Sequence, residues 1–346
     1  MGKFIKILAL LSVFSIALCS CQKEEVKETV TEPIPQITEQ KVFFKSPLTN
    51  LPVLEEDAVG NRPVAVMINN VGAALPHRGI SKADIVYEVV VEGGITRLLA
   101  IFSDTANLPY IGPIRSSRHY YVDFALPYNA VYLHFGGSPA GYQRIKSTGI
   151  DNIDGMAYSK DFYQDMARAN SKGKEHSYFV SQKEFDKIAK KSGISLNGET
   201  KAPFAFYEKE YFPKNNDAAK VFASFSGSAN STFTYDKSTG LYSKQRNGAK
   251  HIDANTGNVL QYKNILILYT GIGSYNGEAL RRDVALNSGS GYYITNGGKD
   301  VINWKKGNSS NQFVFTDQNG EALKVNSGKT YICILGNERK GNTTIK

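Results

Sequence analysis

The chain has 346 residues and a formal net charge of +9, from 41 Lys and Arg against 32 Asp and Glu. Its basic residues form no dense run, and the export signal described below argues against a nucleic-acid partner. Of its three cysteines only Cys333 lies beyond residue 21, so no disulfide can form within the folded body. A hydrophobic core must therefore stabilise the body, and about 300 residues suffice for one large or two ordinary domains.

Residues 1–20 have the layout of a signal peptide, with lysines near the N-terminus and an apolar run at 7–18. This run is shorter than the roughly 20 apolar residues that span a membrane. The segment Leu18-Cys-Ser-Cys21 resembles a lipobox, and this resemblance implies diacylglyceryl transfer to the Cys21 thiol and cleavage after Ser20. Lipidation would anchor the protein to the cell membrane on its extracytoplasmic side, so the membrane is an expected partner.

The composition then changes along the chain. Residues 21–45 begin with the lipidated cysteine and continue with a segment rich in Glu, Lys, Thr, Gln and Pro, which predicts a flexible tether. In the next region we expect strands at 63–68, 84–102 (as a hairpin) and 131–135, and helices at 116–126, 139–147 and 182–191. Later strands are expected at 232–235, 240–245, 265–269, 292–295, 313–315 and 329–335. The predicted fold class is a mixed α/β N-terminal domain, 46–200, followed by a mostly β C-terminal domain, 215–340.

The predicted hairpin carries two glutamates and one arginine. If Gly93-Gly94 is a two-residue loop, Arg97 lies diagonally between Glu88 and Glu92, on one face of the sheet. Such a network is either a structural ion pair or part of an active site. Residues four apart on a strand have Cα atoms about 13 Å apart, whereas glycosidase carboxyls lie about 5–9.5 Å apart. This disfavours an acid/base pair made of the two glutamates alone, and leaves open one of them acting with a partner elsewhere.

Basic residues also gather at the start of the predicted helix 116–126. Arg115, Arg118 and His119 oppose the helix dipole there, so we expect either a neighbouring carboxylate, such as Glu88 or Glu92, or a bound anion. Asn69 and Asn70 directly follow the predicted strand 63–68. Open α/β sheets bind ligands at such strand ends, so both asparagines are candidate ligand-binding residues.

A glycine turn follows the predicted strand 131–135. Gly136-Gly137-Ser138 with Pro139 has the outline of a nucleophile elbow, but Pro139 lacks the N–H that an oxyanion hole needs. Ser138 as a helix N-cap with proline at the first helical position explains the same residues better. Gly136, Gly137 and Ser138 remain weak candidates for an anion site. The five histidines show no metal-ligand spacing, so neither a metal nor a cofactor is expected.

Several of these segments resemble the YerB-like lipoproteins, a two-domain family of unknown function. The matching stretches are Arg62-Pro-Val-Ala-Val-Met-Ile-Asn-Asn70, Ala83-Asp-Ile-Val-Tyr-Glu88, Val91-Glu-Gly-Gly-Ile-Thr-Arg97 and Ile111-Gly-Pro-Ile-Arg-Ser-Ser-Arg118, with Lys250-His-Ile-Asp253, Thr256-Gly257, Trp304 and Gly328-Lys-Thr330 further on. The resemblance implies an α/β domain, a β-rich domain and surface anchoring, but no settled activity. One departure is Lys174-Glu-His-Ser177, where the family has a Pro-His-Asn-like stretch.

The functional hypothesis is a membrane-anchored envelope protein that binds a cell-wall component or an envelope partner. Peptidoglycan or an anionic wall polymer is the expected ligand. The expected groove is lined by polar and charged residues, namely Asn70, Glu88, Glu92, Arg97, Arg115 and Arg118. The alternative is an extracytoplasmic hydrolase or lyase acting on wall glycan, with Glu88 or Glu92 as acid/base and an arginine stabilising charge. The sequence leaves open whether the protein is an enzyme.

Overall fold

A computed structural model describes residues 42–215, 217–278 and 281–346. The predicted signal peptide, the predicted lipidation site Cys21 and the predicted tether up to residue 41 lie outside this part. Across the described segments, no helix is both long and apolar enough to cross a membrane.

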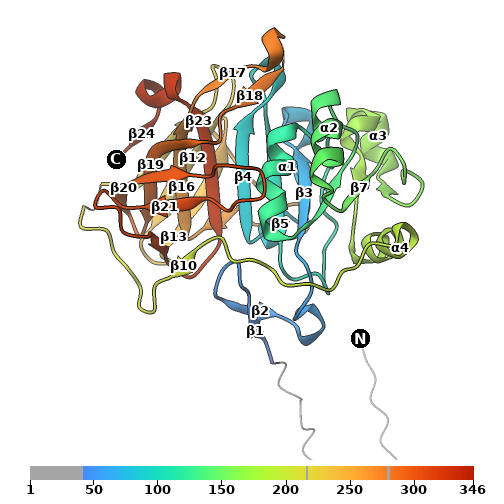
Figure 1. Cartoon of the computed structure of the whole chain (residues 1–346), viewed down its shortest axis with the longest axis horizontal. Coiled ribbons are helices and arrows are strands. Elements are labelled where there is room, and N and C mark those ends of the chain that lie inside the picture. The colour runs from blue at the N-terminus through green and yellow to red at the C-terminus, as the bar shows by residue number, and fades with distance from the viewer. Residues whose placement is uncertain (1–41, 216, 279–280) are drawn as a thin grey trace, which may run out of the picture. The chain divides into compact units, whose positions relative to one another are not determined.

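A ten-stranded mixed sheet forms the centre of the body (Figure 1). In spatial order its strands are β21 (Val314–Thr316), β20 (Gly298–Lys305), β19 (Ser288–Thr295), β16 (Asn264–Thr270), β23 (Thr330–Gly336), β4 (Ile85–Val90), β5 (Thr96–Phe102), β3 (Val64–Asn69), β6 (Val131–His134) and β7 (Asn152–Asp154). Strand β23 pairs in parallel with β16 on one side and with β4 on the other. One sheet therefore contains strands from both the N-terminal and the C-terminal regions.

The four α-helices of the described chain all belong to the N-terminal region: α1 (His119–Ala125), α2 (Pro139–Thr148), α3 (Met166–Lys172) and α4 (Gln182–Ser192). Helix α2 begins as expected, because the Ser138 hydroxyl accepts a hydrogen bond from the Gly141 N–H and Pro139 is the first helical residue. Helix α1 begins at His119 rather than Ser116, so Arg115 precedes the helix by several residues.

A second, antiparallel sheet is formed by the C-terminal region. Its strands are β14 (Ala249–Lys250), β13 (Leu241–Arg246), β12 (Asn230–Asp236), β11 (Lys220–Ser224) and β24 (Thr344–Ile345), and β15 (Gln261–Tyr262) pairs with β13. Beyond the α4 helix, the described residues contain strands and short 3-10 turns but no α-helix. The predicted fold class, α/β followed by mostly β, is confirmed.

Short elements complete the body. Two-stranded pairs are β1 (Phe44–Lys45) with β2 (Pro52–Leu54), β8 (Tyr163–Gln164) with β9 (Tyr178–Phe179), β10 (Ala205–Phe206) with β22 (Lys324–Val325), and β17 (Ile272–Ser274) with β18 (Arg282–Val284). The 3-10 helices are Glu56–Ala58, Gly72–Ala74, Ile80–Lys82, Glu92–Gly94, Leu126–Tyr128, Lys174–His176, Tyr275–Gly277 and Asn337–Asn342.

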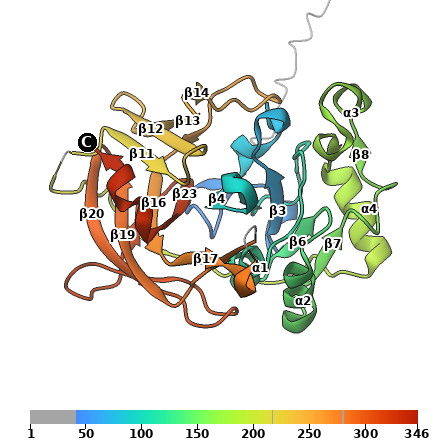
Figure 2. The same cartoon turned by 90° about the horizontal axis from the view of Figure 1, so that it is seen from above.

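The large sheet is buried on both faces, which is why strands such as β3 are continuously apolar rather than alternating. One face packs against the second sheet and α4, and the other packs against α1 and α2. Figure 2 shows the second sheet and α1 on opposite sides of these strands. Cys333 lies on β23, fully buried, as expected for an apolar filler.

The β4–β5 hairpin has a longer loop than the one predicted from Gly93-Gly94. The Val91 N–H donates to the Ile95 carbonyl oxygen (2.7 Å), which closes the loop around both glycines. In this register Glu88 lies opposite Leu98, so Arg97 points to the other face of the sheet. The predicted placement of Arg97 beside Glu88 is therefore wrong, because a one-residue change in loop closure reverses the side-chain faces.

Candidate functional site

Glu88 lies at the centre of the large sheet and is only 1% exposed. One of its carboxylate oxygens accepts hydrogen bonds from Asn70 Nδ2 (2.9 Å) and Thr96 Oγ1 (2.7 Å). The other accepts from Ser231 Oγ (2.7 Å) and Tyr331 Oη (2.6 Å). These donors come from both regions of the chain and surround the carboxylate. Glu88 therefore connects the N-terminal and C-terminal regions through hydrogen bonds, and its carboxylate is buried away from any external substrate. We call this cluster the buried junction.

A buried polar chain continues from this carboxylate. Lys244 Nζ is 3.9 Å from Glu88 Oε2 and 3.1 Å from His251 Nδ1. His251 Nε2 is 2.7 Å from His77 Nδ1, and His77 Nε2 is 2.6 Å from the Asn69 carbonyl oxygen. A carbonyl oxygen only accepts, so His77 carries its proton on Nε2 and its Nδ1 accepts from His251. His251 Nδ1 then accepts from Lys244, so both ring nitrogens of each histidine have a hydrogen-bond partner.

The pKa values agree with two neutral histidines. Burial lowers the pKa of His77 to about 3, although the hydrogen bond to the Asn69 backbone opposes this shift. Burial and the charge of Lys244 place the pKa of His251 well below its ordinary value. Burial also lowers the pKa of Lys244, while the charge of Glu88 acts in the opposite direction. This series of buried polar groups therefore consists of the Glu88–Lys244 ion pair and two neutral histidine rings, and it lies between the two sheets.

Glu92 lies in the β4–β5 loop and is the carboxylate that faces the arginines. Its two oxygens accept from Arg118 Nε (2.5 Å) and Nη2 (2.8 Å), and Arg97 Nη2 lies 3.8 Å away. Burial raises the pKa of Glu92, but the bonds from Arg118 and the charges of both arginines outweigh it, so the net pKa is below its ordinary value. Glu92 is therefore ionised at neutral pH and poorly suited to donate a proton.

His119, at the start of α1, is covered by the β17–β18 arm of the C-terminal region. Its Nε2 lies 2.8 Å from Asp283 Oδ1, and its ring lies 4.9 Å from the ring of Tyr275, between centroids. The candidate residue His119 is thus occupied by contacts within the chain.

Arg115 lines a cavity of about 620 Å³ together with the turn Gly136-Gly137. The cavity also contains the rings of Phe135 and Tyr178, whose centroids are 4.3 Å apart. The Arg115 guanidinium makes no hydrogen bond or ion pair with another described residue. Burial lowers its pKa, and the charge of Glu175 acts in the opposite direction. The structure thus brings together Arg115 and the glycine turn Gly136-Gly137, which the sequence analysis predicted as two separate candidate sites.

The remaining candidates have mainly structural contacts. Asn69 Nδ2 lies 2.9 Å from His176 Nδ1, and Ser138 is occupied as the cap of α2. The Asn70 carbonyl oxygen accepts from Arg246, and its amide nitrogen bonds Glu88. The other predicted residues form three groups: the buried junction of Glu88 with Asn70, the arginine group with Glu92, and the Arg115 pocket with Gly136 and Gly137.

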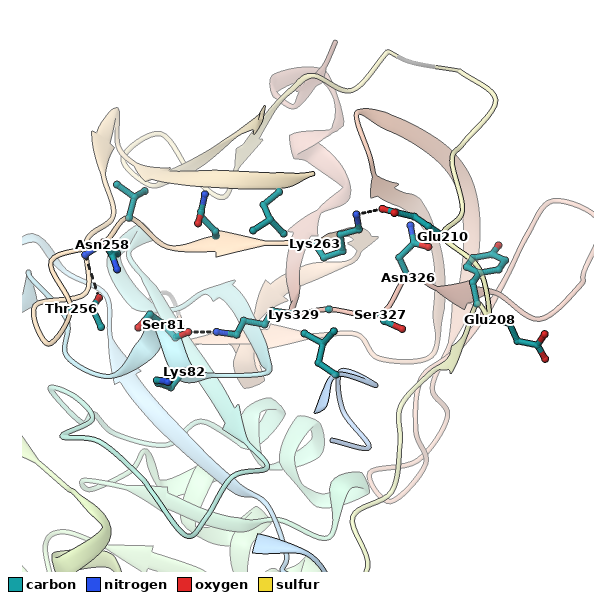
Figure 3. Close-up of a pocket in the computed structure, with 16 residues that line it drawn as sticks. Ser81, Lys82, Glu208, Glu210, Thr256, Asn258, Lys263, Asn326, Ser327 and Lys329 are labelled. Carbon is teal, nitrogen blue, oxygen red and sulfur yellow. Dashed lines mark hydrogen bonds and ion pairs between the residues drawn. The ribbon is translucent and has the colours of Figure 1, made fainter. Parts of the chain in front are cut away.

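Sequence reasoning missed a second cavity, of about 650 Å³ (Figure 3). Three lysines line it, Lys82, Lys263 and Lys329, together with Asn258 and other polar side chains. These residues are far apart along the chain and form no motif, so no local pattern could have marked them. In the described part of the chain, no cluster of three or more His, Cys, Asp or Glu could hold a metal ion.

The fold and the cavities define a mixed α/β and β protein in which two regions share one sheet, with a cationic pocket on the N-terminal region. The chain belongs to the DUF3048 family, described as a protein of unknown function: the N-terminal domain model matches residues 48–195 and the C-terminal domain model matches residues 221–332. The predicted family resemblance is confirmed.

Two comparisons concern one Bacillus subtilis protein. The chain is 30% identical over 341 residues to the protein of strain 168 named "Putative lipoprotein YerB", covering 97% of this chain and 96% of the relative. The crystal structure of the YerB protein from Bacillus subtilis matches with a TM-score of 0.77 and 29% identity, covering 88% of this chain and 99% of that one. Neither description states an activity or a ligand.

Proposed function

We propose that this protein is an exported lipoprotein, anchored to the cell membrane through Cys21, whose body binds peptidoglycan in the Arg115 pocket on the extracytoplasmic side. The observation that carries the binding proposal is the Arg115 guanidinium, which lines the pocket without a hydrogen-bond partner among the described residues. A half-buried cation of this kind favours an anionic ligand group.

The rest of the pocket suits a wall glycan with attached peptides. A guanidinium offers a planar fork of N–H donors that matches a carboxylate, the group that ends wall peptides. The neighbouring rings of Phe135 and Tyr178 and the exposed side chain of Met156 offer apolar surface to a sugar ring. Arg115 and Lys174 outnumber Glu175 among the charged residues of the lining, so the pocket has a net positive charge.

Anchoring is tested by replacing Cys21 with Ala. The lipobox resemblance, together with the description of the YerB relative as a lipoprotein, supports lipidation at this residue. We expect the native chain to incorporate labelled palmitate and to partition into the detergent phase, and Cys21→Ala to do neither. Incorporation of label into Cys21→Ala would contradict the assignment of the anchor.

Binding is tested by pelleting the purified full chain with insoluble peptidoglycan. Arg115→Gln should weaken binding by roughly 10- to 150-fold, since a hydrogen bond to a charged group contributes about 1.5–3 kcal/mol. Arg339→Gln, on the C-terminal 3-10 helix and outside this pocket, is the matched control. Equal pelleting of the native chain and Arg115→Gln would contradict the proposal.

The same mixture should be analysed for released fragments. Binding without products supports the proposal, whereas fragments that disappear in Glu92→Gln would instead support the hydrolase or lyase hypothesis. Absence of both pelleting and products would overturn peptidoglycan as the ligand and favour an envelope protein partner.

A further inference from the structure

The larger cavity is built mainly by four segments of the chain that the fold brings together. The turn with Ser81 and Lys82 forms one wall, residues 256–263 form a second, and residues 326–329 before β23 form a third. The segment with Tyr207 and Glu210 closes the far side. Figure 3 shows Lys82 and Lys329 near Ser81, and Glu208 on the opposite side of the view. The cavity shares no lining residue with the Arg115 pocket.

The lysines of this cavity differ in how many of their N–H donors are used. Lys263 Nζ donates to Glu210, to Asn296 Oδ1 (2.6 Å) and to the Gly240 carbonyl oxygen (3.4 Å), so all three donors are satisfied. Lys329 Nζ donates to the Ser81 carbonyl oxygen and makes no ion pair with another described residue. Two of its donors therefore remain for a ligand.

Lys82 provides a second available cation. Its side chain is exposed and makes no hydrogen bond or ion pair with another described residue. Burial and the charge of Lys82 lower the pKa of Lys329, whereas the charge of Asp84 raises it. Two neighbouring ammonium groups repel each other, so an anion bound between them would be stabilised by both.

The nearest acids are already occupied. Asp84 Oδ2 accepts from the Ser103 N–H (2.7 Å) and hydroxyl (2.6 Å). Asp253 accepts from the N–H groups of Gly79 (3.0 Å) and Ser81 (2.8 Å), which fixes the turn that carries Lys82. Neither carboxylate forms an ion pair with Lys82 or Lys329 in the described chain, although the charges of both carboxylates raise the pKa of Lys329.

The wall beside the lysines offers neutral hydrogen-bonding groups. The side-chain amides of Asn258 and Gln261 make no hydrogen bond with another described residue. Each amide has both a donor and an acceptor, which suits ligand hydroxyl groups. The lining contains no arginine, and lysines bind a tetrahedral phosphate as point charges without the fork that favours a planar carboxylate.

We propose that this cavity binds a polyol phosphate, with the phosphate between Lys82 and Lys329 and the polyol hydroxyls on Asn258 and Gln261. Both the headgroup of a glycerophospholipid and a polyol-phosphate polymer of the wall carry this chemistry. The proposal is independent of the ligand of the Arg115 pocket.

The test is a calorimetric titration of the full chain, in micelles of a neutral detergent, with sn-glycerol 3-phosphate. We expect saturable binding that Lys82→Gln weakens about fivefold, as for an exposed charge pair of up to about 1 kcal/mol. Lys160→Gln, an exposed lysine outside the cavity, should bind as the native chain does. Lys329→Gln should abolish binding; because it also removes a hydrogen bond to Ser81, its circular dichroism spectrum should be compared with that of the native chain.

Each outcome decides a part of the proposal. Absence of saturable binding, or equal binding by the native chain and Lys82→Gln, would overturn it. Inorganic phosphate binding as tightly as glycerol 3-phosphate would overturn the polyol assignment. Competition by soluble glycerol phosphate oligomers would identify a wall polymer, and competition by phosphatidylglycerol in the micelles would identify a lipid headgroup. Arg115→Gln should leave this binding unchanged.

Discussion

Acidification should destabilise the protein through His77, which is fully buried between the two regions. Its pKa is about 3 in the folded chain and about 6.5 when unfolded. Between these values the unfolded chain binds a proton that the folded chain does not, so the stability present above pH 6.5 is lost as the pH falls. At pH 5, 1.5 pH units below the unfolded value, the free energy of unfolding should be lower by about 2 kcal/mol.

A second buried group acts in the opposite direction over the same range. Burial raises the pKa of Asp84 to about 6, from 3.8 when unfolded, although hydrogen bonds from Ser103 lower it. The folded chain therefore binds the proton more readily, and acidification from pH 7 to 5 should add roughly 1.3 kcal/mol. The native chain alone would show both effects together with that of His251, whose pKa is also lowered by burial, so the prediction is made for the difference between the native chain and His77→Gln.

The assay is urea unfolding of both chains, followed by circular dichroism at pH 7, 6 and 5. Asp84 contributes to both chains, so its effect cancels in the comparison. The native chain should lose about 2 kcal/mol more than His77→Gln between pH 7 and 5. The same pH dependence in both chains would refute the reasoning, because it would mean that His77 is not held neutral by burial.

Three further predictions concern individual residues. Glu88→Gln should lower the free energy of unfolding by about 3–5 kcal/mol, because the buried Lys244 loses its counter-charge. In the same urea titration Glu92→Gln should lower the free energy of unfolding by less, because Glu92 is less buried. An equal loss in both variants would contradict this reasoning. Arg118→Gln should raise the pKa of Glu92, since it removes the bonds that lower it, and an unchanged NMR titration of Glu92 would count against this pairing. Gly291→Ala should lower the unfolding temperature, because an added Cβ would lie 1.9 Å from a backbone oxygen of β16. Gly227→Ala is the control, because its Cβ would enter open space and should leave the unfolding temperature unchanged. Equal unfolding temperatures of the two variants would refute the clash.

Local signals predicted the elements whose structure depends on a few neighbouring residues. The cap of α2 follows from Ser138 and Pro139 alone, and the continuous apolar run of β3 indicates a strand buried on both faces. The change from mixed α/β to mostly β structure was likewise visible in the turn residues and strand patterns. The family resemblance rested on motifs of several consecutive residues, which is why it held over nearly the whole chain.

The partners of the candidate residues could not be predicted in the same way. Glu88 receives hydrogen bonds from Ser231 and Tyr331, which lie 143 and 243 residues further along the chain. Tyr331 reaches it because β23 inserts between β16 and β4, and Ser231 reaches it because β12 of the second sheet packs against the large sheet. No local pattern specifies either arrangement. The hairpin register likewise depended on one backbone hydrogen bond in its loop.

The sequence by itself determined which segments form helices and strands, which family the chain resembles, and the expectation of an exported, lipid-anchored protein. The tertiary structure decided which charges meet. It enclosed Glu88 with Lys244, paired Glu92 with Arg118, and left Arg115 beside a glycine turn without a partner in the described chain. The physical reason is range: propensities and caps act over a few residues, whereas ion pairs and cavities depend on strand order across the whole sheet.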